Sequence, residues 1–319
     1  MEFIRGLTNL QRQKKACVAT IGNFDGVHLG HQAVLEQLKS SVEGSELIST
    51  VLIFEPQPIE FFSPDKAPSR LTRLREKLQQ FDQHDIDRVV CLRFNGGIAN
   101  LTAAAFVEEI LVNALAIQGL IIGDDFRFAK NREGDYHTLI DAGKKYGFDV
   151  RMTKTFNTDG DRISSTLIRQ ALAKGDMTRA TKMLGRPYRI TGRVVHGDKR
   201  GQRLGFATAN IELHRYLSPV VGIFSGRVYG IASEPLDAVI YVGSRPVYKG
   251  EDVILEVHIL DFDADLYGKH LQVEFLEKLR GEGDFESEAA LVAQIEKDIN
   301  NARMSLERNK PEQLITTIT

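Results

Sequence analysis

Tryptophan is absent from this chain of 319 residues, and cysteine occurs only twice. Cys17 and Cys91 lie in the apolar runs ACVATIG and DRVVCLRF, which are the usual surroundings of a buried free thiol. A disulfide framework or a redox centre is therefore not expected. Net charge is small as well, because 41 lysines and arginines stand against 43 aspartates and glutamates. Without a basic excess, the sequence predicts no nucleic-acid partner and no attraction to an anionic membrane.

Long apolar runs are also missing. No stretch approaches the roughly 20 apolar residues of a transmembrane helix, and the first residues, MEFIRGLTNLQRQKKA, have no apolar signal core. The pattern GxxxxGK[ST] does not occur, which excludes a P-loop kinase. We therefore expect a cytoplasmic protein without a membrane partner, either a monomer or a weak homo-oligomer.

The length of the chain predicts two domains. The first half alternates short β-branched apolar runs with helical patterns, which is typical of an α/β, Rossmann-like domain with a parallel sheet. We expect strands at 16–22, 46–54, 87–94, 118–123 and 148–153, and helices at 29–42, 70–83, 102–115 and 136–146.

The pattern changes between residues 164 and 184, where two short helices end at Gly175 and Gly185. From Tyr188 onward, alternating strands separated by turn residues indicate a small antiparallel β-barrel. A last segment, 287–308, spaces its apolar residues as one helix face and should pack against the barrel. We place the two domains at 1–185 and 186–319.

The first candidate site is GNFDGVHLGHQ, residues 22–32, which leaves a strand and enters a helix. A phosphate would fit there, because a helix start offers N–H groups and glycines allow close approach. His28 and His31 share one helix face. A surface turn with incidental histidines is the alternative, and a zinc pair would lack further ligands. The predicted binding residues of this turn are Gly22, Asn23, Phe24, Asp25 and Gly26.

Two further segments could complete that site. In RISSTLIRQAL, the hydroxyls of Ser164, Ser165 and Thr166 precede a helix whose first turns carry Arg169. Serine or threonine before a helix is usually only a cap, but beside the histidine turn this segment offers donors and a guanidinium to a polyphosphate. The cluster GDDFRF after the fourth strand adds Asp125 and Arg127 as candidate ligand contacts.

The second candidate site is RVVHGDKRGQRLGFATAN, residues 193–210. Its glycines alternate with cations, which suits a nucleotide phosphate, although a solvated hairpin would look the same. The candidate binding residues are Gly197, Lys199, Gly201 and Gly205. Thr208 and Asn210, in an extended segment, should point the same way toward a metal or phosphate oxygens.

A lone carboxylate, Glu256, lies in the run VILEVHIL, where Ile254, His258 and Leu260 should share its strand face. Such a residue is either an edge-strand charge or a base in a pocket. The residues alone do not decide between these two readings.

The turn GNFDGVHLGHQ resembles the HxGH signature of nucleotidyltransferases. Together with FEPQP (54–58), GDDFRF with REGD (132–135), and ISSTLIR (163–169), it is similar to the FMN adenylyltransferase half of bacterial riboflavin kinase/FAD synthetases. The resemblance implies adenylyl transfer from ATP to FMN, giving FAD and pyrophosphate. A phosphate monoester, with a second pKa of about 6, is already an ionised nucleophile. His28, His31 and Arg169, with Mg²⁺, would align it and neutralise charge.

The second half resembles the riboflavin kinase barrel of the same family. The family's GxPTAN maps onto Gly205–Asn210, its catalytic glutamate onto Glu256, and its YGK onto 267–269. The resemblance implies that Glu256 takes the proton of the riboflavin 5′-hydroxyl and that Thr208 and Asn210 help to hold MgATP. Arg280 is counted with the ATP- or flavin-binding residues of this half.

The sequence departs from the family pattern at several positions. Ala207 replaces a proline, Tyr241 an asparagine, Val247 a threonine and Asp284 a basic residue, and Ala129 stands near an expected glycine. These changes keep an alternative open, in which the barrel is a weakened flavin-binding or regulatory module on an active adenylyltransferase. A tRNA synthetase relative is a third reading, which the near-neutral charge disfavours. The retained residues favour a bifunctional enzyme.

Overall fold

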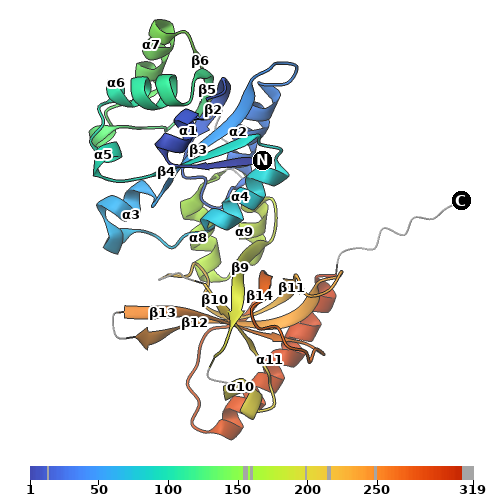
Figure 1. The fold of residues 1–319 in the computed structure, drawn as a ribbon. Helices are drawn as coiled ribbons and strands as arrows, with labels where there is room; N and C mark the ends of the chain where they lie inside the picture. Colours follow the sequence, from blue (N-terminus) through green and yellow to red (C-terminus); the bar gives the residue numbers. More distant parts are fainter. Residues whose placement is uncertain are drawn as a thin grey trace, which may run out of the picture. The chain divides into compact units, whose positions relative to one another are not determined.

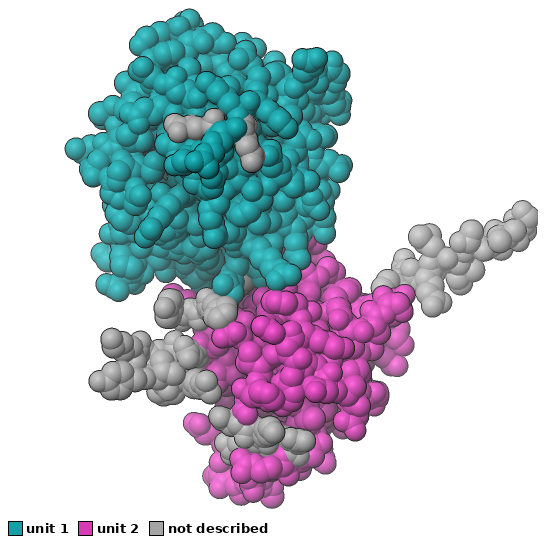
Figure 2. All heavy atoms as spheres, viewed as in Figure 1, with its two compact units in different colours: residues 1–165 teal, residues 166–319 magenta. Residues whose placement is uncertain are grey.

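The computed structural model describes the chain except for residues 13, 154–156, 159–160, 198–199, 214–216, 248–249 and 311–319. The chain folds into two compact units, Met1–Ser165 and Thr166–Thr319 (Figures 1 and 2). Lys199, one of the predicted phosphate-binding residues, lies outside the described residues. No helix in the described part of the chain combines the length and apolar character needed to cross a membrane.

The first unit is built on a six-stranded parallel sheet in the order β1-β4-β3-β2-β5-β6. Its strands are β1 (Glu2–Arg5), β2 (Cys17–Ile21), β3 (Ile48–Glu55), β4 (Arg88–Arg93), β5 (Ile117–Gly123) and β6 (Asp149–Thr153). The five expected strands are confirmed. β1 was not expected, because four residues carry too little of a pattern.

The helices of this unit are α1 (Leu7–Arg12), α2 (Leu29–Ser40), α3 (Pro58–Phe62), α4 (Leu74–Gln83), α5 (Gly96–Ala99), α6 (Ala103–Ala105) and α7 (Tyr136–Tyr146), with the 3₁₀ turns η1 (Pro64–Lys66) and η3 (Lys130–Arg132). The helix expected at 102–115 begins as predicted, with the Thr102 hydroxyl accepting from the Ala105 N–H, but continues as a π-helix, η2 (Phe106–Ala114). A short hairpin joins β7 (Asn157–Thr158) to β8 (Asp161–Arg162).

Apolar side chains cover both faces of the sheet. All five residues of β2 are buried. On one face, Ala19 packs in a cluster with Phe106 and Ile110 of η2, and on the other face Val18 packs with Leu35 of α2 and Phe81 of α4. Burial on both faces explains why the strands read as continuous apolar runs in the sequence.

The order of the strands places a switch point between β2 and β5, since the chain builds outward in opposite directions from this pair. In open α/β sheets, ligands bind beyond the carboxyl ends of the strands at such a point. The 22–32 segment follows β2, and the Asp124 loop follows β5. The topology therefore brings two of the predicted motifs to one edge of the sheet.

The second unit is a closed antiparallel barrel in the order β10-β13-β12-β11-β14-β9. Its strands are β9 (Tyr188–Val195), β10 (Ala209–Glu212), β11 (Gly222–Tyr229), β12 (Leu236–Val247), β13 (Gly250–Ile259) and β14 (His270–Arg280), and its helices are α8 (Ser165–Lys174), α9 (Met177–Leu184), α10 (Arg200–Arg203) and α11 (Glu288–Arg308). The expected barrel is confirmed.

The terminal helix α11 packs on the outer surface of the barrel, as the sequence predicted (Figure 1). Ala302 and Leu306 of α11 are buried with Leu260, and Val239 of β12 packs against them. The Ser305 and Ser225 hydroxyls are 2.7 Å apart under this helix. Leu291 and Ile295, in the first turns of α11, line a cavity together with residues of the barrel.

Candidate active sites

The turn after β2 brings the two predicted histidines together at the start of α2. His28 is the N-cap, and its Nδ1 accepts from the backbone N–H of His31 at 3.3 Å. The two rings stack with centroids 3.7 Å apart. The turn needs left-handed backbone at Gly26, with a φ of 84°. Both imidazoles therefore lie where the helix start offers N–H groups and positive potential to an anion.

Buried Asp25 fixes the shape of this turn. Its carboxylate accepts from the backbone N–H of Leu71 at 3.1 Å and of Thr72 at 3.0 Å. The Thr72 hydroxyl in turn accepts from the Gly26 N–H at 2.8 Å, and the Ser165 hydroxyl donates to the Asp25 carbonyl at 2.9 Å. Asp25 and Ser165, predicted to contact ligand, thus make contacts that hold the turn itself.

The other residues of the turn divide into packed and accessible groups. Phe24 is buried, and its ring packs against those of His31 and Phe81, with centroids 5.0 and 5.4 Å away. A Cβ at Gly22 would lie 3.0 Å from the Phe24 ring, so a larger residue there would press on this ring. Asn23 is exposed. Of the predicted turn residues, Asn23 is therefore the side chain most open to a ligand.

The loop after β5 is organised by ion pairs. Arg162 Nη2 lies 2.9 Å from Asp124 and 3.0 Å from Asp125. Arg127 donates to Asp135, which caps α7. The Thr138 backbone N–H and hydroxyl, together with Arg127, lower the pKa of Asp135 to about 2. The predicted ligand contacts Asp125 and Arg127 are thus held in place by protein partners.

Ser164 is half-buried and Ser165 starts α8, in agreement with the expected hydroxyl run at a helix start. Thr166 is exposed and Arg169 is half-buried. Both belong to α8 and to the second compact unit. Their predicted contact with a polyphosphate stays a prediction.

The segment after β3 contains features that the sequence reading did not single out. Arg70 donates to both carboxylate oxygens of Glu55, at 3.0 and 2.8 Å, and also pairs with Glu60. Phe61 and Phe62 of α3 are exposed and pack edge-to-face with Phe94. The only sequence signal for this aromatic pair was its position two residues after FEPQP.

In the barrel, three side chains form a row across neighbouring strands. Glu256 of β13 stands opposite Asn210 of β10 on one side and Tyr241 of β12 on the other. Paired residues of antiparallel strands project from the same face. The alternating residues Leu255 and Val257 are buried on the other face, in the core. The row therefore points away from the core of the barrel.

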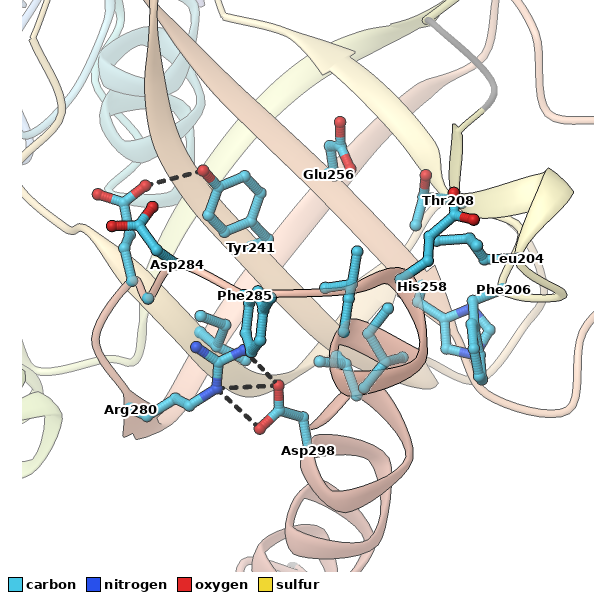
Figure 3. Close-up of a pocket in the computed structure, with 18 of the residues that line it drawn as sticks. Leu204, Phe206, Thr208, Tyr241, Glu256, His258, Arg280, Asp284, Phe285 and Asp298 are labelled. Carbon is cyan, nitrogen blue, oxygen red and sulfur yellow. Dashed lines mark hydrogen bonds and ion pairs between the residues drawn. The ribbon is translucent and has the colours of Figure 1, made fainter. Parts of the chain in front are cut away.

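This row lines a cavity of about 990 Å³ (Figure 3). Figure 3 shows Glu256 between Tyr241 and Thr208, with Asp284 and Phe285 on the loop that follows β14. Leu291 and Ile295 of α11 also line it. The lining thus combines apolar side chains with polar and charged groups, among them the row of Asn210, Glu256 and Tyr241. The reading of Glu256 as an edge-strand charge is wrong, because its strand, β13, pairs with β10 on one side and with β12 on the other.

A second cavity of about 240 Å³ lies on the other side of Thr208 and Asn210, which line both cavities. Gly197 and Tyr267 also line this smaller space. A Cβ at Gly197 would come within 2.5 Å of Asn210 Oδ1, and one at Gly201 within 2.5 Å of the Phe206 carbonyl. These two predicted glycines therefore leave room for the side chain and backbone that border the cavities.

Arg280 lines the larger cavity but is engaged by the protein. Its Nε and Nη2 donate to the Asp298 carboxylate of α11 at 2.8 to 3.0 Å, and its Nη1 donates to the Gly281 carbonyl. Its guanidinium also lies over the Phe285 ring, 5.6 Å from the centroid. Binding of ATP or flavin by Arg280 stays a prediction.

The positions that depart from the family pattern have distinct surroundings. The Ala207 carbonyl is 2.8 Å from His258 Nδ1, so this turn is tied to β13 without a proline. Tyr241 and Asp284 both line the larger cavity. His258 and Glu282, also in its lining, were not singled out from the sequence. The Val247 side chain lies outside the described residues.

The fold and the two sites define a two-unit nucleotide-dependent transferase. A family model described as FAD synthetase matches residues 10–167, and one described as riboflavin kinase matches residues 184–306. The chain is 48% identical to the bifunctional riboflavin kinase/FMN adenylyltransferase of Escherichia coli (strain K12), over 98% of this chain and 100% of that protein. The Haemophilus influenzae protein of the same name is 45% identical, over 95% and 98%.

The chain belongs to the family of bifunctional riboflavin kinase/FMN adenylyltransferases and combines both activities, with the FAD synthetase part first. A crystal structure described as a macrolide-efflux protein from Streptococcus pneumoniae is also similar. Its TM-score is 0.79 at 27% identity, over 95% of this chain and 99% of that one.

Proposed function

We propose that riboflavin is phosphorylated in the larger cavity of the second unit with Glu256 as general base, and that FMN receives an adenylyl group at the histidine turn of the first unit. The row of Asn210, Glu256 and Tyr241 along the cavity is the observation that carries the kinase assignment. This row puts the Glu256 carboxylate beside the Asn210 amide, in a space large enough for a flavin.

The kinase step needs a base, because an alcohol is a poor nucleophile until its proton is removed. Glu256 accepts the proton of the 5′-hydroxyl while the alcohol oxygen bonds to the γ-phosphorus of ATP and the bond to ADP breaks. General-base catalysis of this kind contributes roughly 10²- to 10⁴-fold to a rate. The smaller cavity, which Gly197, Thr208 and Asn210 border, is the proposed place of the ATP phosphates.

Magnesium fits the residues at the border of the two cavities. The Thr208 hydroxyl and the Asn210 amide oxygen are hard oxygen donors of the kind Mg²⁺ prefers, and Gly197 leaves space beside the amide. No group of three or more His, Cys, Asp or Glu side chains suited to a metal occurs in the described part of the chain. Thr208, Asn210 and the phosphates would hold the ion, and the ion would neutralise the charge of the phosphates.

The adenylyl transfer step needs positioning rather than a base. An oxygen of the FMN phosphate bonds to the α-phosphorus of ATP, and pyrophosphate leaves. The stacked His28 and His31, the α2 N-terminus and the exposed Asn23 offer donors to these anions. Ser164, Thr166 and Arg169 are proposed as the further contacts. The switch point between β2 and β5 supports this location.

Two variants test this division. The purified protein is incubated with MgATP and either riboflavin or FMN, and the flavins are separated. Glu256→Gln should lower FMN formation about 10²-fold or more and leave FAD formation from FMN intact. His28→Ala should do the reverse. Glu277→Gln, on β14 and outside both cavities, is the matched control.

The outcomes separate the competing readings. Loss of both activities in Glu256→Gln would show that the two sites are not divided as proposed. FAD from FMN, but no FMN from riboflavin, in the unaltered protein would favour a barrel with a regulatory role.

We further propose that the protein acts in the cytoplasm as a monomer or weak homo-oligomer. Sedimentation velocity at several protein concentrations tests the oligomeric state.

A further inference from the structure

The wall of the larger cavity that follows β14 is held by few contacts. Residues 281–287 connect β14 to α11 and bring Glu282, Asp284 and Phe285 to the cavity. Among the described residues, no backbone-to-backbone hydrogen bond joins 281–286 to another element. A segment of this kind depends on side-chain contacts for its position.

Two side chains supply these contacts. Arg280 donates to the Gly281 carbonyl at 3.0 Å and lies over the Phe285 ring. The Tyr241 hydroxyl donates to Glu282 Oε1 at 2.8 Å, and Figure 3 shows this contact as the dashed line from Tyr241. The hydrogen bond from Tyr241 joins the loop to β12, the strand that pairs with the Glu256 strand β13.

The local structure of β12 is shaped around this hydrogen bond. Gly243 is two residues beyond Tyr241 and therefore on the same face of the strand. A Cβ at Gly243 would overlap the Tyr241 hydroxyl and approach Glu282 Oε1 to 2.5 Å. The tyrosine ring can lie along the strand, and Glu282 can reach it, because residue 243 has no side chain.

The hydrogen bond also has a persistent donor. Burial, together with the nearby carboxylates of Glu282 and Glu256, raises the pKa of Tyr241. The phenol therefore stays protonated well above neutral pH and continues to donate. Tyr241 pairs with Glu256 across β12 and β13, so its ring lies close to the proposed base.

We infer that Tyr241 is a positioning residue for riboflavin, which holds the 281–287 segment as a cavity wall through Glu282. This inference rests on the proposed flavin site. It predicts that the hydrogen bond acts on flavin binding and leaves the chemical step unchanged, since Tyr241 is not assigned a proton transfer. The asparagine that the resemblance leads one to expect at this position is too short to extend over Gly243 in the same way.

Tyr241→Phe tests the inference by removing one oxygen and keeping the ring. The KM for riboflavin and the Kd from flavin fluorescence quenching should both rise about tenfold, because a hydrogen bond to a charged acceptor is lost. The kcat should stay within about twofold. FAD formation from FMN should not change. Glu282→Ala should have the same effect, and the double variant should be no worse than either single one.

Tyr229→Phe is the matched control. Its hydroxyl also donates to a carboxylate of the barrel, Glu274, at 3.1 Å, but it lines neither cavity. Riboflavin affinity should be unchanged in this variant. Glu282→Gln, which keeps an oxygen acceptor, should bind riboflavin more tightly than Glu282→Ala.

An unchanged riboflavin Kd in Tyr241→Phe, a loss of kcat alone, or additive losses in the double variant would overturn the inference. Failure of the proposed base would appear differently, as a normal kcat in Glu256→Gln with riboflavin binding intact.

Discussion

The two reactions require different side chains because their nucleophiles differ. A hydroxyl must lose a proton as it attacks, and the barrel places one carboxylate, Glu256, in the cavity row. The FMN phosphate is already ionised, and the first unit offers the stacked imidazoles of His28 and His31 with a helix start. The sequence contains this contrast, since the carboxylate and the histidines both lie in recognisable patterns.

Other important residues have no such signal. Lys77 of α4 is fully buried, with its Nζ 3.9 Å from Glu55 Oε1. Burial lowers the pKa of Lys77, and the charges of Asp25 and Glu55 oppose this effect. Nothing in the run LREKLQQF marks this lysine as different from the exposed lysines of other helices. Its environment comes from α4 packing beneath the carboxyl ends of the strands.

The lowered pKa of Lys77 predicts a pH dependence of stability. Between this pKa and the ordinary value of 10.5, the unfolded chain binds more protons than the folded one, so the free energy of unfolding should rise with pH. In Lys77→Met this contribution is absent. Urea unfolding of both proteins from about pH 7 to about pH 10 should show the wild type gaining stability relative to the variant.

The exposed Lys144, on α7, gives the control for this measurement. Lys144→Met removes the same charge from an exposed position, so it separates the effect of burial from the effect of losing a lysine. A wild-type advantage that shrinks with pH would contradict the burial effect at Lys77.

At the level of elements, the alternation of side chains along a strand predicted which residues share a face. The extended segment Ala209–Glu212 and the strand Gly250–Ile259 formed as expected, and Thr208 and Asn210 line the same cavities. Leu260, expected on the face of Glu256, is buried beneath α11 on the outer surface of the barrel, where it packs with Val239. Val239 pairs with His258, which shares that face, so the two-residue period agrees with the structure here.

Gly197 allows a test of how closely β10 and the preceding loop approach each other. Gly197→Ala should lower riboflavin phosphorylation about tenfold or more, because the new Cβ would overlap the Asn210 amide. FAD formation from FMN should be retained. The assay is the same pair of flavin conversions.

Gly281→Ala is the comparison variant, since a Cβ there meets nothing within 4 Å. Equal losses in both variants would show that the loss does not arise from the contact with Asn210.

At the level of the whole molecule, the chain divides into two units with separate cores. The contacts within the structure divide the two units after Ser165, whereas the sequence predicts the domain boundary after residue 185. The intervening α9 contacts β9 and β14, and its residues Met177, Ala180, Met183 and Leu184 are buried. The predicted boundary at 185/186 remains to be tested.

Two fragments of the chain test the boundary. Because α9 packs on the barrel, residues 166–319 should unfold at a higher temperature than residues 186–319, which lack the helix. Both melting temperatures can be followed by circular dichroism. Equal values, with equal riboflavin phosphorylation, would support the boundary at 185/186 instead.

The sequence alone determined the fold class of both halves and most strands and helices, and it predicted His28, His31, Thr208, Asn210 and Glu256 as site residues, because each depends on a local pattern or a short motif. The tertiary structure decided the partners of these groups. Asp25 with Thr72, Tyr241 with Glu282, and Arg280 with Asp298 join residues far apart in the chain. The spacing of apolar residues along the sequence predicts which face of a strand or helix a side chain occupies. Only the packing of distant segments determines which residues that side chain contacts.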